Sequence, residues 1–314
     1  MPIRDCTGDD LKMSNQHTLV ETLFKKPADI FNLPDPERCA AAYRGAAPYP
    51  HVVMTDFFKA DILKLLTQEL VAQDVRFRTV FTDDFQKEKT ISTGDAVPPL
   101  ISLVASKFAA PEMLRYLEKL TGLKRLVPDP YYNTDYGYYH IVGGGGVLGS
   151  HVDHSRHSTL NIPHVLNLVV YLTENWDDAD GGTLCLFDSS GERVVQRAPC
   201  RYNNAVLFAC TPTAYHGVEP VAPDSKRRRH SLYFAYYTVD FAGGDAQSFF
   251  PAVQNAASNA DPTVNYGTYF VVPFRSLFRP ANWIHLRTRL VYLANLLLPP
   301  ILMVAIRKIV RSSR

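Results

Sequence analysis

The sequence predicts an α+β protein in which helices come first and an antiparallel sandwich or barrel of short strands follows. Segments with apolar residues at helical spacing lie before residue 122. From residue 128 onward, short β-branched and aromatic segments alternate with turns rich in Gly, Asp and Asn. Hydrophobic residues make up 46% and charged residues 20% of the 314, a globular composition and not a disordered one.

The elements follow in a simple order along the chain. Residues 1–45 are polar and interrupted by Pro and Asp, and we expect them to form an N-terminal extension. A strand is expected within PYPHVVMTDFF (48–58), and then helices over 61–70, 98–108 and 111–121. The last of these should end at Gly122, because glycine adopts the left-handed conformation that follows many helices. The predicted strands lie at 165–172, 182–187, 205–210 and 231–239.

The C-terminal part has a different character from this globular unit of residues 46–240. A connecting region covers 241–289, and an apolar and basic tail covers 290–314. Its segment LVYLANLLLPPILMVAI (290–306) has 17 uncharged residues, is interrupted by Pro299-Pro300, and falls short of the roughly 20 residues of a spanning helix. No acidic residue follows Asp261, whereas eight basic residues do. We expect a membrane-associating anchor on an anionic surface, with a helix pair packed on the core as the alternative.

Charge and cysteine content exclude several classes of protein. The formal net charge is only +2, and we expect no nucleic-acid partner. Five cysteines without a CxxC pair argue against a disulfide framework and against a thiolate zinc site. The N-terminus has no apolar segment typical of a secretory signal, so we expect a cytoplasmic protein, peripheral on the inner face of the cytoplasmic membrane if the tail is an anchor.

The segment HVDHSRHSTLNIPHVLNLVVYL (151–172) carries the strongest chemical signal. His151 and Asp153 point to the same side if they lie on a strand. A third ligand, His216 in TPTAYHGVEP, would complete the two-histidine, one-carboxylate set of non-haem Fe(II) oxygenases. A zinc cluster with His154 and His157 is the weaker alternative, because a strand points His154 away from His151. We expect both residues to be solvated members of a loop over 154–163.

A basic anchor is predicted in KRRRHSLYFAYY (226–237). Arg229, Ser231 and Tyr233 share one face by the period of two. An arginine that points into a barrel is costly unless it meets an anion, and a carboxylate is its natural bidentate partner. Arg227 has the same phase and is a competing anchor.

Four stretches in order resemble the prolyl 4-hydroxylase-like, bacterial type of 2-oxoglutarate and Fe(II)-dependent oxygenase. They are GGGGVLGSHVD (143–153), LNLVVYLTENWDDADGGTLCLF (166–187), YHGVEPV (215–221) and RHSLYFAYY (229–237), within a match over roughly 48–240. The resemblance implies a double-stranded β-helix (a jelly-roll, cupin-like core) with N-terminal supporting helices, and an oxygenase domain over 46–240. It implies His151, Asp153 and His216 as iron ligands.

The resemblance also implies a binding site for 2-oxoglutarate. Arg229 is expected to bind the C5 carboxylate, with Ser231 and Tyr171 beside it, and Asn167 shares the face of Tyr171. Upstream of the glycine run, Tyr138, Tyr139 and His140 are candidates for one position in the pocket, and His140 is the one chosen for testing.

The implied reaction hydroxylates an unactivated C–H bond with Fe(II), 2-oxoglutarate and O2, releases succinate and CO2, and can use ascorbate as a reductant. Because the tail is basic and apolar, we hypothesise an envelope glycan or glycolipid substrate, such as a Kdo sugar, or another small molecule. A peptidyl-prolyl hydroxylase-like enzyme, a cupin-like metal protein without 2-oxoglutarate, and a non-catalytic binding module remain as alternatives.

Overall fold

The computed structural model describes residues 21, 25–72, 78–81, 86–92, 97–129, 138–157 and 160–240. The expectations for 241–289 and 290–314, including the membrane anchor, therefore lie outside the described residues. Within the described ranges, no helix is both long enough and apolar enough to cross a membrane.

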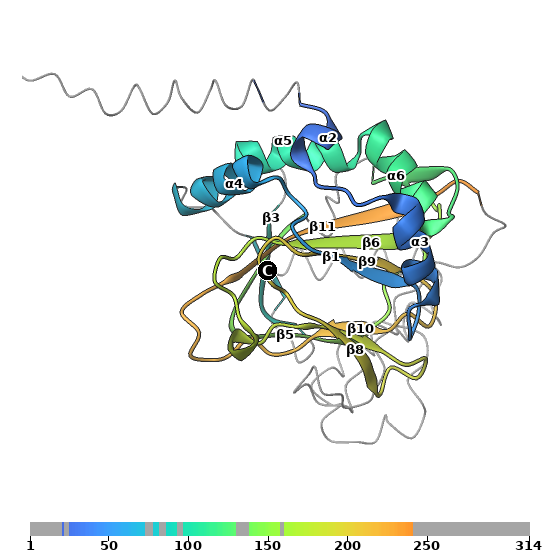
Figure 1. Cartoon of the computed structure of the whole chain (residues 1–314). Helices are drawn as coiled ribbons and strands as arrows, with labels where there is room; N and C mark the ends of the chain where they lie inside the picture. Colours follow the sequence, from blue (N-terminus) through green and yellow to red (C-terminus); the bar gives the residue numbers. More distant parts are fainter. Residues whose placement is uncertain are drawn as a thin grey trace, which may run out of the picture.

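An antiparallel sheet folds over to make two facing layers, drawn one above the other in Figure 1. The strand order is β1-β9-β6-β11-β5-β10-β7-β8, with β3 paired to β5, β2 to β3 and β4 to β11. The bounds are β1 His51–Met54, β2 Arg78–Phe81, β3 Gln86–Ser92, β4 Leu126–Pro128, β5 Tyr139–His151, β6 His164–Tyr171, β7 Leu184–Phe187, β8 Val194–Ala198, β9 Ala205–Ala209, β10 His216–Val218 and β11 Arg229–Thr238. This is the jelly-roll of a double-stranded β-helix, and the predicted fold class is confirmed.

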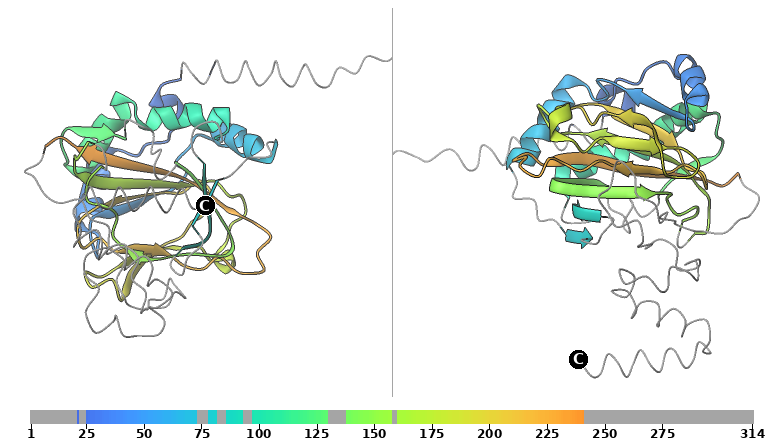
Figure 2. Two further views of the ribbon diagram at one scale, coloured as in Figure 1. Left: turned by 180° about the vertical axis from the view of Figure 1, so that it is seen from behind. Right: turned by 90° about the horizontal axis from the view of Figure 1, so that it is seen from below.

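Helices cover the outer face of the layer that contains β6 and β11, as Figure 1 and the left view of Figure 2 show. They are α2 Pro27–Ile30, α3 Pro36–Gly45, α4 Ala60–Ala72, α5 Pro99–Phe108 and α6 Pro111–Thr121. The three predicted helices correspond to α4, α5 and α6. The last ends at Gly122, whose φ of 81° is the left-handed conformation expected there.

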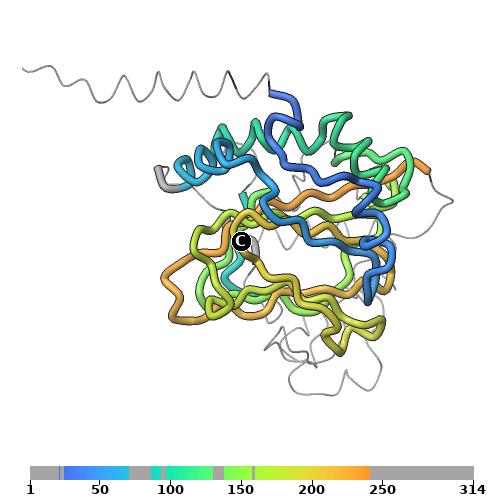
Figure 3. The backbone as a smooth tube through the Cα atoms, in the orientation of Figure 1, coloured from blue at the N-terminus to red at the C-terminus, as the bar shows by residue number. Residues whose placement is uncertain are grey.

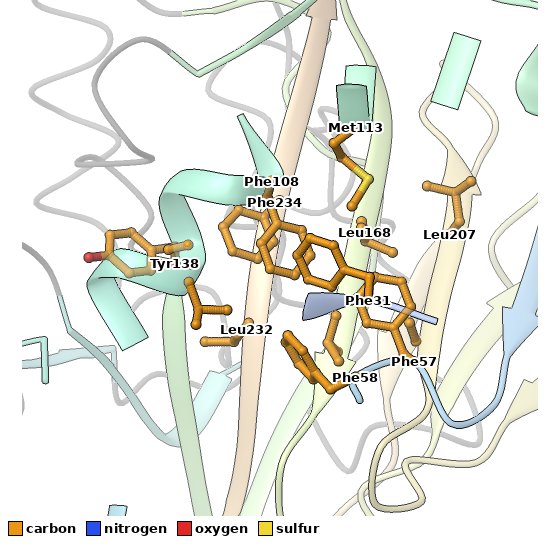
Figure 4. Close-up of a cluster of buried hydrophobic side chains, with 14 of the residues drawn as sticks. Phe31, Phe57, Phe58, Phe108, Met113, Tyr138, Leu168, Leu207, Leu232 and Phe234 are labelled. Atoms are coloured by element: carbon orange, nitrogen blue, oxygen red, sulfur yellow. The ribbon is translucent and has the colours of Figure 1, made fainter. Parts of the chain in front are cut away.

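Side chains alternate between the two faces of each strand, so the sheet layer under the helices contributes to two separate hydrophobic cores. On β6, Leu166, Leu168 and Val170 pack against the helices, whereas Val169 and Tyr171 face the space between the layers. The core under the helices is rich in aromatic rings, and Figure 4 shows them stacked between α5 and the strands. There the rings of Phe108 and Phe234 lie 3.9 Å apart.

Residues assigned above to an N-terminal extension contribute to this aromatic core. The ring of Phe31, just after α2, lies 4.8 Å from that of Phe108 and 5.2 Å from that of Phe57. In α3, Ala40 and Tyr43 are buried. The tube in Figure 3 shows this blue part of the chain running directly into β1, which pairs with β9 from more than 150 positions later.

The glycine run 143–146 lies inside a 13-residue strand, β5, that the strand pattern did not predict as a whole. Its first residues pair with β11 and its last with β10, so β5 belongs to both layers. Glycines permit this change of direction: Gly145 has φ +77°, and a Cβ on Gly144 would lie 2.8 Å from the carbonyl oxygen of Pro223. The short strands β2, β3, β8 and β10 also escaped prediction.

Candidate functional site

A cavity of about 210 Å³ lies between the two layers. Residues from β3, β5, β6, β7, β9, β10 and β11 line it. Among them are His140, His151, Asp153, Tyr171, His216, Arg229 and Ser231. Seven of the eight residues predicted for the site therefore share one cavity, although they come from four separate parts of the sequence.

The candidate metal ligands meet where β5 and β10 run side by side. His151 ends β5 and pairs with His216, which begins β10. The imidazole Nε2 of His151 lies 3.3 Å from Oδ1 of Asp153, and Nε2 of His216 lies 3.7 Å from Oδ2. One ligand atom from each of the three residues lies within 4.8 Å of the other two. The arrangement matches a facial triad, which leaves coordination positions open.

Backbone contacts orient both imidazoles toward this point. Nδ1 of His151 lies 2.9 Å from the carbonyl oxygen of Gly149, and Nδ1 of His216 lies 3.1 Å from that of Ala214. A carbonyl oxygen only accepts, so each Nδ1 carries the proton and donates. The lone pair of each Nε2 is then directed at the shared space, as metal-binding histidines require.

Electrostatics favour the ligand forms of these groups. Burial, followed by the nearby His151, lowers the pKa of His216 to about 4, so its imidazole is neutral near pH 7. Burial alone would raise the pKa of Asp153, but His216 and His151 hold it well below its ordinary value. Imidazole nitrogens and a carboxylate oxygen are donors that suit Fe(II).

Asn167 lies behind the triad and not on the cavity wall, where it was expected to face the cosubstrate. Its amide nitrogen donates a 2.6 Å hydrogen bond to Oδ2 of Asp153, and its carbonyl oxygen lies 2.8 Å from Nε2 of His164. Asp153 lies just after the end of β5, and there its carboxylate contacts Asn167 of β6. The sequence did not predict this contact, because it depends on how the chain turns after β5.

Arg229 lines the same cavity. It is 5% exposed, and its guanidinium carbon lies 4.8 Å from the centre of the Tyr171 ring. Nε of Arg229 and the hydroxyl of Tyr171 are buried without a hydrogen-bond partner among the described residues. Ser231 pairs with Tyr171 across β11 and β6. Unsatisfied buried donors that converge on a cavity suit a ligand carboxylate, so these residues fit one end of 2-oxoglutarate.

The structure separates the two candidate arginine anchors. The side chain of Arg227 is 42% exposed, and its Nη2 lies 2.6 Å from Oδ2 of Asp180. Arg227 is therefore paired on the surface turn, and Arg229 alone of the two lines the cavity.

The three candidates upstream of the glycine run, Tyr138, Tyr139 and His140, have different surroundings in the structure. His140 lines the cavity, with its ring stacked 5.3 Å from that of Tyr233. The Tyr138 hydroxyl bonds Ser102 under the helices, and the Tyr139 hydroxyl lies 2.7 Å from Nδ1 of His230. His140 is the one that faces the pocket.

The expectation of solvated loop histidines is wrong for His157, which is 4% exposed. Its Nε2 lies 3.6 Å from a carboxylate oxygen of Asp129, and its Nδ1 accepts a hydrogen bond from the backbone of Leu160. His154 lines the cavity beside the triad. Arg156 is also buried, at 3% exposed, so tertiary contacts cover two polar residues of the loop, whereas Asn161 is exposed.

Two further residues of the site were missed. His164 reaches the triad through Asn167, and Lys89 on β3 lines the cavity. His164 is the fourth histidine of the segment 151–172, and this cluster of histidines was a visible signal for it. Nothing in the sequence around 86–92 marked Lys89, because its strand was not predicted.

A family model matches the part of the chain that carries most of this site. The model of the 2OG-Fe(II) oxygenase superfamily matches residues 136–237. Mouse (Mus musculus) prolyl 3-hydroxylase OGFOD1 is 23% identical over 213 residues, which cover 66% of this chain and 36% of that protein. This chain thus matches about a third of the length of its curated relative.

Solved structures with a similar fold include a Pseudomonas putida prolyl-4-hydroxylase, with 18% identity, a TM-score of 0.46, and coverage of 64% of this chain and 98% of that one. HygX from Streptomyces hygroscopicus, solved with nickel, 2-oxoglutarate and hygromycin B, has 13% identity and a TM-score of 0.41. The match covers 61% of this chain and 84% of HygX. The family match over residues 136–237 confirms the predicted resemblance to the 2OG-Fe(II) oxygenase superfamily for this part of the chain.

Proposed function

We propose that the protein is a 2-oxoglutarate-dependent dioxygenase that hydroxylates an unactivated C–H bond. One observation carries the proposal: a His–Asp–His set and a buried arginine, whose Nε has no hydrogen-bond partner among the described residues, line one cavity. When bound, Fe(II) would activate O2, which is the oxidant, and 2-oxoglutarate would supply two electrons as it is decarboxylated to succinate and CO2. One oxygen atom would then enter succinate and the other the hydroxylated substrate.

The residues of the chain have separate tasks in this proposal. His151, Asp153 and His216 hold the metal from one side. Arg229, Ser231 and Tyr171 bind the C5 carboxylate, which orients the cosubstrate and fixes its distance from the metal. The apolar wall, which includes Val169, Leu184 and Phe208, restricts water near the reacting atoms.

The decisive experiment is spectroscopic. Anaerobic protein loaded with Fe(II) should develop a weak visible charge-transfer band when 2-oxoglutarate is added. The band should be lost in Asp153→Ala and weakened in Arg229→Ala, whereas Arg227→Ala, the matched surface arginine, should retain it. Iron-loaded wild type without a band would reject the proposal and favour a binding module.

Arg229 also distinguishes this enzyme from a cupin-like metal protein. A metal-only site has no need for a buried arginine 4.8 Å above a tyrosine ring. If the Arg229→Ala variant retains full metal-dependent activity without 2-oxoglutarate, the cupin-like alternative is correct.

The substrate is a separate proposal. A peptidyl proline is supported by the likeness to the mouse prolyl 3-hydroxylase over 213 residues. An envelope glycan or glycolipid such as a Kdo sugar depends on the apolar, basic segment 290–314, as does peripheral binding to a cytoplasmic membrane. Co-sedimentation of the full chain with anionic liposomes, compared with a chain ending at residue 289, tests that hypothesis, and equal recovery of both chains would remove its basis.

Two further predictions complete the proposal. The oxygenase unit extends from about residue 26 to 240, because α2 and α3 share the aromatic core. Ascorbate would act as a reductant that restores Fe(II). Its effect should appear as slower inactivation over many turnovers, and an unchanged inactivation rate would exclude that role.

A further inference from the structure

Lys89 occupies an unusual place for a lysine, on the inward face of β3. Ile91, two residues later on the same strand, is 4% exposed, and both side chains line the cavity. The register of β3 against β5 shifts between Lys87 and Lys89, and Glu88 between them has φ +50°. A bulge at this point re-aims the following side chains, and such bulges are frequent next to active sites.

Strand register places Lys89 and Arg229 on either side of one residue. Val142 of β5 pairs with Lys89 on β3 and with Arg229 on β11. Neighbouring strands are about 4.8 Å apart, so the two Cα atoms are separated by roughly 10 Å across this row. All three side chains line the cavity. Two long cationic side chains therefore enter the same space from adjacent parts of its wall.

The charge in the cavity is unbalanced. Of the described residues that line it, Asp153 is the only acidic one, and the proposed metal would take its carboxylate. The ammonium of Lys89 forms no ion pair or hydrogen bond with a described residue. A cation held in a largely apolar cavity is costly without a partner, and such groups are more frequent at functional sites than elsewhere.

The ammonium also lies within electrostatic reach of Asp153 and of Arg229. Burial lowers the pKa of Lys89 to about 8, while Asp153 raises it and Arg229 lowers it further. Arg229 already has Ser231 and Tyr171 beside it for one carboxylate. A five-carbon dicarboxylate has a second negative charge at its other end, toward the triad.

We propose that Lys89 is a second cationic contact for 2-oxoglutarate, and that it binds the C1 carboxylate end near the triad while Arg229 binds the C5 end. This inference rests on the proposed function. It makes Lys89 a residue that positions the cosubstrate and raises its affinity. Hydrogen bonds to charged groups contribute enough that its loss should weaken binding by roughly tenfold or more.

The test is an anaerobic titration of the Fe(II)-loaded full chain, followed by the visible band. Two ligands are compared: 2-oxoglutarate, and 2-oxopentanoate, which has the same length but no C5 carboxylate. Lys89→Met should raise the Kd of both ligands by a similar factor, and Lys89→Arg should restore much of the affinity. Arg229→Met should raise the Kd of 2-oxoglutarate alone. Lys87→Met, on the same strand but off the cavity wall, should change neither value.

Two results would overturn the inference. Unchanged Kd values in Lys89→Met would show that the ammonium does not contact the cosubstrate. An effect confined to 2-oxoglutarate would assign Lys89 to the C5 end instead. Failure of the proposed function itself is distinguishable, because iron-loaded wild type would then show no band with either ligand.

Discussion

The side-chain amide of Asn167 donates a 2.6 Å hydrogen bond to Oδ2 of Asp153, the oxygen that faces His216 at 3.7 Å. Asn167 is fully buried, and its carbonyl oxygen contacts His164 on the other side. This contact fixes the orientation of the only carboxylate in the candidate triad, and residues of this kind tune metal sites as strongly as some direct ligands.

Asn167→Ala should therefore weaken metal binding. The Asp153 carboxylate would lose this amide donor, and outer contacts of this type are typically responsible for about 10- to 100-fold in metal affinity. Anaerobic competition of Fe(II) or Mn(II) against a fluorescent chelator measures the change. Asn203→Ala is the matched control, because its buried amide bonds the backbone of Phe58 and Asn203 does not line the cavity. Equal metal affinity in Asn167→Ala and wild type would show that the contact is only structural.

Gly182→Ala should reduce 2-oxoglutarate affinity while metal affinity is retained. A Cβ at residue 182 would lie 2.9 Å from Cδ of Arg229, so the guanidinium must move from its place above Tyr171. The substitution also strains a backbone at φ +66°. Gly122→Ala has a similar positive φ but no atom within 4 Å of its Cβ, and it controls for that strain. If both variants bind 2-oxoglutarate equally well, the position of Arg229 is not limiting.

Phe31→Ala should destabilise the whole unit and not only the N-terminal segment. Its ring lies among those of Phe57, Phe58 and Phe108. Removing a buried aromatic ring costs about 3–5 kcal/mol, which urea unfolding followed by tryptophan fluorescence can measure. Leu160→Ala, at an exposed leucine, should have little effect. A normal unfolding midpoint for Phe31→Ala would mean that residues 26–45 are dispensable to the core.

His230 should make the fold less stable at mildly acidic pH. Burial, followed by the charge of Arg228, lowers the pKa of His230 to about 4 in the folded chain. The unfolded value is about 6.5, so the unfolded state binds more protons between pH 6.5 and 4. The free energy of unfolding therefore falls as the pH drops through this window and is unaffected above it.

The His230→Asn variant provides the comparison, because it removes the titration but keeps a polar group near the Tyr139 hydroxyl. Its loss of stability between pH 7.5 and 5 should be smaller than that of wild type. Urea unfolding at the two pH values measures both changes, and identical losses would assign the acid sensitivity to other buried histidines.

The element types were largely predictable, and the exceptions have a common cause. Helices α4 to α6 and strands β6 and β11 follow from the spacing of their apolar residues. The helices bury one face against these strands, and the strands bury one face against the helices. Strand β5 was obscured by four consecutive glycines, which disfavour strands locally. The pairing of β5 with both layers supplies hydrogen bonds that outweigh this preference, and no local pattern reports such pairing.

The sequence by itself identified the family resemblance and the three candidate metal ligands, His151, Asp153 and His216. It could do so because the HxD spacing, the distal histidine and the arginine-containing strand are linear motifs. Tertiary structure alone decided that Arg229 and not Arg227 enters the cavity, that Asn167 contacts Asp153, and that Lys89 faces Arg229 across Val142. The physical reason is that strand register and a bulge determine where a side chain points, and register depends on partners distant in the sequence.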